Sequence, residues 1–257
     1  MFSHEGKARS FSENARLAIA LSGVAGAVNA TGFFVVGTYT SHVTGNLARV
    51  GDELAQGHLA LAWDFLVLVV AFLFGAMTAT VLVDVARRIG GRAHYRSTLL
   101  LEALLLGLFT VLSAGAGPKP HLYLLVLTAI LSYAMGMQNA LVTRISGAVV
   151  RTTHLTGITT DLGIELVRLW IWYRERTAGL GLLGRLRHLP EILVHEELER
   201  AWLHLAIFGS FFLGAVAGPL LYLWSGHLAM ALPCLVLVSL LGLDLAKRRR
   251  PAPAMLR

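Results

Sequence analysis

The chain has 257 residues, of which 56% are hydrophobic and only 14% are charged, and its mean hydropathy is +0.66. Soluble domains carry about a quarter charged residues, so this composition excludes an ordinary soluble protein and predicts one that crosses the membrane several times. The net charge is +7, but the arginines stand beside the ends of apolar runs, where they orient membrane proteins, and this placement argues against nucleic-acid binding. The single cysteine, Cys234, lies inside an apolar run and predicts neither a disulfide framework nor a thiolate metal site.

A short polar tail, residues 1–15, begins the chain and is expected to lie in the cytoplasm. The predicted first membrane repeat, residues 16–116, has three apolar spans, at residues 16–36, 61–83 and 98–114. Between the first two spans, residues 42–53 place apolar and polar side chains on different faces at helical spacing. This segment predicts an amphipathic or re-entrant helix that is too short to cross the membrane alone.

The predicted second membrane repeat, residues 117–246, has the same order of elements, with apolar spans at residues 121–142, 201–224 and 227–246. A second amphipathic helix reaches Tyr173 and ends in tryptophans and arginines, which is typical of a membrane interface. An insert at residues 177–199, basic and then acidic, has no counterpart in the first repeat and is expected in the cytoplasm. The basic tail at residues 247–257 is expected there too.

A polar heptapeptide occurs twice, each time in a short break between apolar runs. Residues 40–46 read Thr-Ser-His-Val-Thr-Gly-Asn and residues 152–158 read Thr-Thr-His-Leu-Thr-Gly-Ile, with their histidines 112 positions apart. In the preceding spans, Gly-Ala-Val-Asn-Ala at 26–30 resembles Gly-Met-Gln-Asn-Ala at 136–140. This internal repeat predicts a protein built from two related halves.

The distribution of lysine and arginine predicts the orientation of the spans. With six spans and both termini in the cytoplasm, the basic segments fall on the cytoplasmic side, whereas eight spans would put the arginine-rich loop at 87–96 outside. Each repeat then holds three spans, an odd number, so the second copy is inverted relative to the first. The predicted fold class is an all-α integral membrane protein with six transmembrane helices as two inverted three-helix repeats, each with a short amphipathic or re-entrant helix after its first span.

These motifs resemble those of the YoaK family of bacterial membrane proteins, a family of unknown function. The resemblance rests on residues 37–45, on Gln-Asn-Ala at 138–140 and on residues 152–157, and it extends from about residue 15 to 246. The insert at 177–199 departs from the more compact family pattern. The resemblance implies a multi-pass protein of the bacterial inner (plasma) membrane and no known activity.

The candidate substrate-binding residues are the polar side chains and glycines of the two breaks and of the adjoining spans. They are Asn29, Ser41, His42, Thr44, Gly45, Asn46, Gln138, Asn139, Thr153, His154, Thr156 and Gly157. Broken helices meeting at the axis between inverted repeats form the sites of secondary transporters, and free amides at helix starts attract anions. The alternative is structural: hydroxyl groups cap the helix starts, histidines face headgroups, glycines allow close packing and asparagines bond between helices.

Four ionisable residues are candidates for proton coupling, because ionisable side chains within a membrane protein mark pathways. They are His42, His154, Glu102 and Asp161. Asp161 also fits a solvated helix face, and Glu102 also fits a position near the cytoplasmic interface beside Arg96. The sequence predicts no metal site, cofactor or catalytic residue, because it lacks a His-x-x-x-His motif, a cysteine pair and the known nucleophile and nucleotide motifs.

Two functions remain open. The first is a small secondary transporter or channel for a small solute or ion, with the duplicated breaks forming the site. The second is a non-transport accessory protein or an integral membrane enzyme, in which the breaks serve helix packing and the 177–199 insert docks a partner; the absence of catalytic motifs makes an enzyme the less favoured of these. The expected partners are the lipid bilayer and the solute, and a homodimer is left open.

Overall fold

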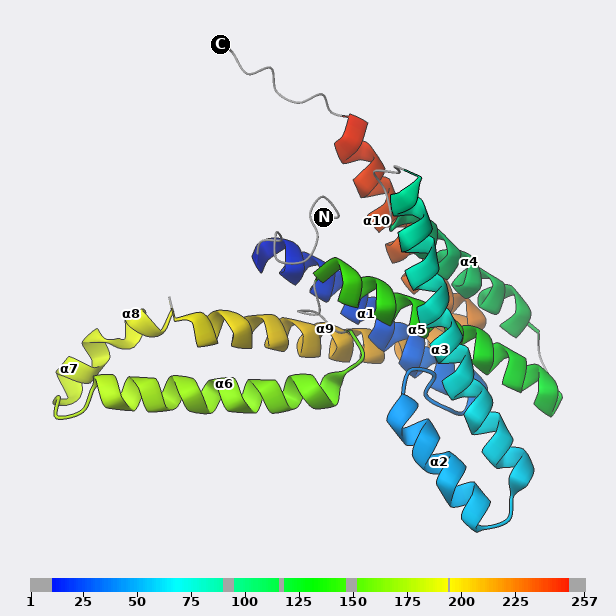
Figure 1. The fold of residues 1–257 in the computed structure, drawn as a ribbon, viewed down its shortest axis with the longest axis horizontal. Coiled ribbons are helices and arrows are strands. Elements are labelled where there is room, and N and C mark those ends of the chain that lie inside the picture. Colours follow the sequence, from blue (N-terminus) through cyan, green and yellow to red (C-terminus); the bar gives the residue numbers. More distant parts are fainter. Residues whose placement is uncertain (1–10, 90–94, 116–117, 147–151, 194, 250–257) are drawn as a thin grey trace.

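The computed structural model describes residues 11–89, 95–115, 118–146, 152–193 and 195–249, and within these ranges the regular structure is helical, without a strand (Figure 1). Five stretches of the described chain are long and apolar enough to cross a membrane: Ala18–Val36, Leu59–Arg88, Arg96–Ser113, His121–Ile145 and Glu196–Leu243. The all-α membrane class predicted from composition is therefore confirmed. The predicted tails at 1–15 and 247–257 fall largely outside the described residues.

The first half consists of three long helices and one short one: α1 (Phe11–Val36), α2 (Val43–Ala55), α3 (Leu59–Arg88) and α4 (Arg96–Ser113). α1, α3 and α4 each begin before the apolar span expected from the sequence, and α3 also ends after it. α2 buries two polar side chains, Asn46 and Glu53, and exposes Leu47 and Leu54 along with Arg49. That arrangement is the reverse of a soluble amphipathic helix and suits a lipid environment.

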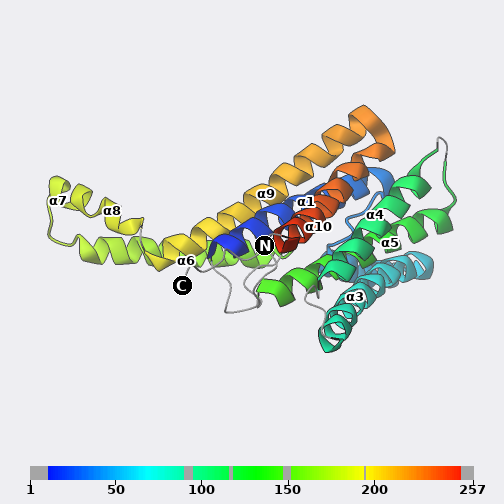
Figure 2. The ribbon, with the colours of Figure 1, turned by 90° about the horizontal axis from the view of Figure 1, so that it is seen from above.

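The second half begins with α5 (His121–Ser146) and α6 (Leu155–Arg176). The insert contains two short helices, α7 (Leu182–Arg187) and α8 (Leu189–Ile192). α9 (Glu196–Ser225) then leads through the 3-10 helix η2 (Gly226–Met230) into α10 (Ala231–Arg249). Gly226 begins this turn with a φ of 60°, a left-handed conformation that favours glycine. Figure 2 shows α10 running back from the far end of α9, so the last apolar stretch contains two helices.

The first helix of each half packs against a long helix of the other half. α1 lies against α9, where a Cβ on Gly26 would meet the backbone carbonyl of Phe211. α5 lies against α3, where a Cβ on Gly136 would meet the backbone carbonyl of Phe72. Because only glycine lacks a Cβ, these two positions let the helix backbones touch.

The buried core lies where α1, α4 and α5 meet, with α10 and η2 covering it. Its largest fully buried side chains include Leu21, Leu99, Phe109 and Leu131. Gln138, also fully buried, crosses from α5 to α1 and donates a hydrogen bond to the carbonyl of Leu21 (3.0 Å). The apolar packing and this bond fix the two first helices relative to each other, which positions the breaks that follow them.

Two helical hairpins extend from the helix bundle, α2 with α3 and α6 with α9 (Figure 1). In each, a buried glutamate of the shorter helix contacts a histidine: Glu53 with His58 at 2.9 Å, and Glu165 with His204 at 2.9 Å. The α6–α9 hairpin carries α7 and α8 at its far end (Figures 1 and 2). It is therefore the longer of the two projections.

Candidate functional site

Both copies of the heptapeptide form the same local structure at the start of a helix. His42 immediately precedes α2 with φ −87° and ψ 65°, and His154 immediately precedes α6 with φ −88° and ψ 54°. Neither helix start is capped by a side-chain hydrogen bond. The amides of both first turns thus lack the side-chain partner that serine, threonine or aspartate commonly supplies.

The glycine of each motif makes room for its histidine ring. A Cβ on Gly45 would collide with the imidazole of His42, and a Cβ on Gly157 would collide with the imidazole of His154. Each imidazole ring therefore lies against the first turn of the helix that it precedes, next to the glycine three residues later in the chain. This contact accounts for the His-x-x-Gly spacing, since any larger side chain at that position would displace the ring.

An asparagine from each preceding span holds the break in place. The Asn29 side-chain oxygen accepts a hydrogen bond from the backbone amide of Ser41 (3.1 Å). The Asn139 side-chain oxygen accepts one from the hydroxyl of Thr153 (2.9 Å). Asn46 adds a bond from its side-chain amide to the carbonyl of Tyr39 (3.3 Å). The sequence predicted polar roles for these asparagines, and the structure places them as anchors of the breaks.

The two breaks meet at one pocket of about 480 Å³. Its lining is Ser41, His42, Val43, Thr44, Phe72, Asn139, Thr143, Thr153, His154 and Thr156. Hydroxyl, amide and imidazole groups provide both hydrogen-bond donors and acceptors, and the described residues of the lining include no carboxylate, lysine or arginine. The imidazoles are its titratable side chains. Such a pocket can hold a small polar solute or an ion and can exchange a proton with it.

Several predicted site residues lie outside this lining. Asn29 borders a separate cavity of about 400 Å³ between α1 and α9. Gln138 is fully buried in the core beside α1. Glu102 is fully buried on α4, and neither of its carboxylate oxygens has a hydrogen-bond partner among the described residues. Asp161 is exposed on α6. The lining therefore gathers seven predicted residues: Ser41, His42, Thr44, Asn139, Thr153, His154 and Thr156. The other predicted residues lie outside it: Asn29, Gly45, Asn46, Gln138, Gly157, Glu102 and Asp161.

Three lining residues, Val43, Phe72 and Thr143, and two glutamate–histidine contacts escaped the sequence-based prediction. Thr143 follows Asn139 by one helical turn, so helical periodicity could have identified it, whereas nothing local marks Phe72. The partners of the buried glutamates, His58 and His204, occupy unrelated places in the two halves, one before α3 and one within α9. A search for equivalent positions therefore cannot find them. The described residues contain no group of three or more potential metal ligands.

Comparison with known proteins gives two matches. A family described as "Protein of unknown function (DUF1275)" matches residues 17–243. The UPF0700 transmembrane protein YoaK of Bacillus subtilis (strain 168) is 27% identical over 139 residues, which cover 54% of this chain and 60% of that relative. No solved structure matches.

Proposed function

The chain belongs to the DUF1275 family of proteins of unknown function, and we propose that it is a small secondary transporter or channel for a small solute or ion. The observation that carries the proposal is that both His-x-Thr-Gly breaks line the same pocket although they stand 112 positions apart. Breaks of this kind, meeting between two related halves, build the sites of known secondary transporters. Residues that served only local packing would have no need to converge.

The proposed architecture is six spans in two inverted repeats, residues 16–116 and 117–246. The contacts support this architecture. The pair α1–α9 has its equivalent in the pair α5–α3, with the roles of the two halves exchanged. Gly26 and Gly136 are 110 positions apart, and the carbonyls they approach, on Phe72 and Phe211, are 139 apart. The turn at η2 divides the last apolar stretch into two helices, which we propose as two crossings. We place the protein in the bacterial inner (plasma) membrane because of its similarity to a bacterial transmembrane protein, and both termini in the cytoplasm on the positive-inside rule.

Within this site, the hydroxyl groups of the two breaks and Asn139 would bind the solute, and the imidazoles of His42 and His154 would carry the proton. Glu102 supports a proton-coupled cycle, because a carboxyl group buried without a hydrogen-bond partner is costly unless it is protonated during part of that cycle. Asp161, which is exposed on α6, would serve at the mouth of the pathway.

The test is solute flux into proteoliposomes, followed by osmotic swelling for a panel of small ions, sugars, amino acids and polyols. The His42→Ala/His154→Ala double variant should lower the flux at least tenfold. His227→Ala, a histidine in η2 and outside the pocket lining, should leave the flux unchanged. Equal flux in all three proteins would overturn the site assignment.

The second candidate is an accessory protein or a membrane enzyme in which the motifs pack helices. The contact of each histidine ring with its own helix favours it, since that contact stabilises a helix start without any solute. In this case no solute would produce flux, the double histidine variant would lose thermal stability, and deletion of residues 177–199 would release a bound partner. The flux and stability measurements on the same variant separate the two candidates.

A further inference from the structure

The far end of the α6–α9 hairpin exposes an unusual amount of apolar surface. Leu182 and Leu183 on α7 have 76% and 78% of their surfaces exposed, and Leu193, just after α8, has 74%. The equivalent hairpin of the first half closes directly between α2 and α3 and carries no such helices. The insert thus adds a surface that the pocket and the helix core do not require.

This apolar surface continues along α6. Glu165 and Leu169 are buried toward α9, whereas Ile164, Val167 and Ile171 are exposed at three- and four-residue spacing on the other side. A helix buried on one side and apolar on the other cannot face water alone along its length. The apolar face of α6 and the leucines of the tip therefore require a covering.

The charge of the tip is positive. Residues 174–191 contain four arginines and two glutamates. Glu191 is already engaged by Arg176 at 3.2 Å and by His188 at 2.6 Å, and the hydrogen bond with His188 is the main reason that the pKa of Glu191 lies below its ordinary value. Within the described chain, the remaining arginines, Arg174, Arg185 and Arg187, have no carboxylate partner. Whatever covers this surface must therefore offer both anionic groups for the arginines and an apolar environment for the leucines.

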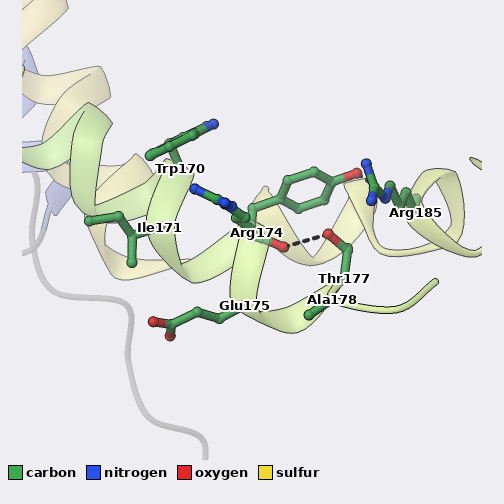
Figure 3. Close-up of a pocket in the computed structure, with 8 residues that line it drawn as sticks. Trp170, Ile171, Arg174, Glu175, Thr177, Ala178 and Arg185 are labelled. Atoms are coloured by element: carbon green, nitrogen blue, oxygen red, sulfur yellow. Dashed lines mark hydrogen bonds between the residues drawn. The ribbon is translucent and has the colours of Figure 1, made fainter.

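Two of these arginines border one hollow of about 550 Å³ between α6 and α7 (Figure 3). Arg174 lies over the indole of Trp170, with its guanidinium carbon 5.5 Å from the ring centre. The Tyr173 hydroxyl donates to the carbonyl of Arg185 at 2.9 Å, which ties α7 to α6. Glu175 also borders the hollow, but its side chain points away from both guanidinium groups (Figure 3). A guanidinium group can donate two parallel hydrogen bonds to the oxygens of one phosphate. Tryptophan side chains are enriched at the headgroup layer of membranes.

We propose that the tip of this hairpin docks on an anionic phospholipid leaflet, with Arg174 and Arg185 each binding lipid phosphate and the leucines of α7 entering the acyl layer. Basic and apolar side chains on one short amphipathic unit match such a leaflet in both charge and polarity. A water-soluble phosphate compound would match the arginines and leave the leucines exposed. The inference is independent of the transport proposal, because it concerns a different pocket and a different face.

A fluorescent label on the tip tests this docking directly. Cys234 is the sole cysteine, and its thiol donates only to a carbonyl, that of Ala103, so a Cys234→Ser background should be tolerated. In that background, Leu183→Cys is labelled with a polarity-sensitive dye in full-length protein in nanodiscs. Phosphatidylcholine containing one third phosphatidylglycerol should shift the emission to the blue and protect the dye from iodide. Phosphatidylcholine alone should do so far less.

The arginine variants decide whether phosphate recognition is involved. Arg174→Gln/Arg185→Gln should abolish the difference between the two lipid mixtures, and native mass spectrometry should show the loss of a retained phosphatidylglycerol. Each arginine is expected to contribute about fivefold in partitioning, the size of one basic side chain at an anionic surface. Arg200→Gln, an exposed arginine already paired with Glu196 at 3.6 Å, is the matched control and should change nothing.

Three results would overturn the proposal. One is the same emission in both lipid mixtures, and another is protection that persists in Arg174→Gln/Arg185→Gln. The third is protection in lipid-free detergent that rises with protein concentration, because a second copy of the chain would then be the cover.

Discussion

Replacing Gly26 or Gly136 with alanine should pull apart the two central helix pairs. The added methyl group would meet the backbone carbonyl of Phe211 in the first case and of Phe72 in the second. A backbone carbonyl cannot rotate away as a side chain can, so α1 must move from α9, or α5 from α3. The close contact along the whole pair is then lost.

The magnitude follows from two opposing effects. Alanine in a helix interior is favoured over glycine by about 1 kcal/mol. Forcing an extra carbon into a packed contact costs about 1–3 kcal/mol, and a blocking backbone atom puts these two sites near the upper end. Each variant should therefore lower the free energy of unfolding by about 2 kcal/mol. The two values should be similar, because the two sites occupy equivalent positions.

Gly209 provides a matched control on α9 itself. A Cβ at this position has no atom within 4 Å, so Gly209→Ala should raise the free energy of unfolding by up to about 1 kcal/mol. Unfolding by dodecyl sulfate in mixed micelles, followed by tryptophan fluorescence, measures all three variants. If Gly26→Ala and Gly136→Ala change stability in the same direction as Gly209→Ala, the close approach of the backbones is refuted. A large difference between Gly26→Ala and Gly136→Ala would refute the equivalence of the halves.

Three further predictions concern the breaks and the insert. Asn139→Ala removes the acceptor of the Thr153 hydroxyl and should cost about 1 kcal/mol, measured by thermal unfolding, while amide exchange at the second break becomes faster. Gly157→Ala should displace the His154 ring into the pocket, so the imidazole should react faster with diethyl pyrocarbonate at unchanged helix content; an unchanged rate would contradict the ring contact. Glu191 has a lowered pKa, so the stability that its pairs add is present at neutral pH and is lost as pH falls through that lowered pKa. A spin label on α8 should therefore gain mobility in acid, and Glu191→Gln should be mobile at neutral pH already.

The sequence predicted the class of fold, and it did so through composition and hydropathy. It also predicted a helix over residues 42–53, close to the observed α2 at Val43–Ala55, because apolar and polar positions there follow helical spacing. The same spacing does not tell which side faces inward. In α2 two polar residues, Asn46 and Glu53, are the buried ones.

The candidate site was predictable in part for a similar reason. Repetition identified His42 and His154, but their contacts with Gly45 and Gly157 require knowledge of the backbone at each helix start. Equivalence by sequence also suggested one environment for both asparagines. The structure places Asn139 in the shared pocket and Asn29 in another cavity, because the packing around the two is not identical.

The pairing of α1 with α9 and of α3 with α5 has a consequence for biosynthesis. The helix that the glycines of α1 fit is made much later, because α9 begins 160 positions after the end of α1 (196 − 36). The small-residue face of α1 must wait in lipid, or against a membrane insertase, until α9 arrives. Neither half can complete its packing by itself, so the two halves mature together. In a chain that stops after α8, α1 would lack the helix against which it packs. We expect such a chain to be degraded by membrane proteases.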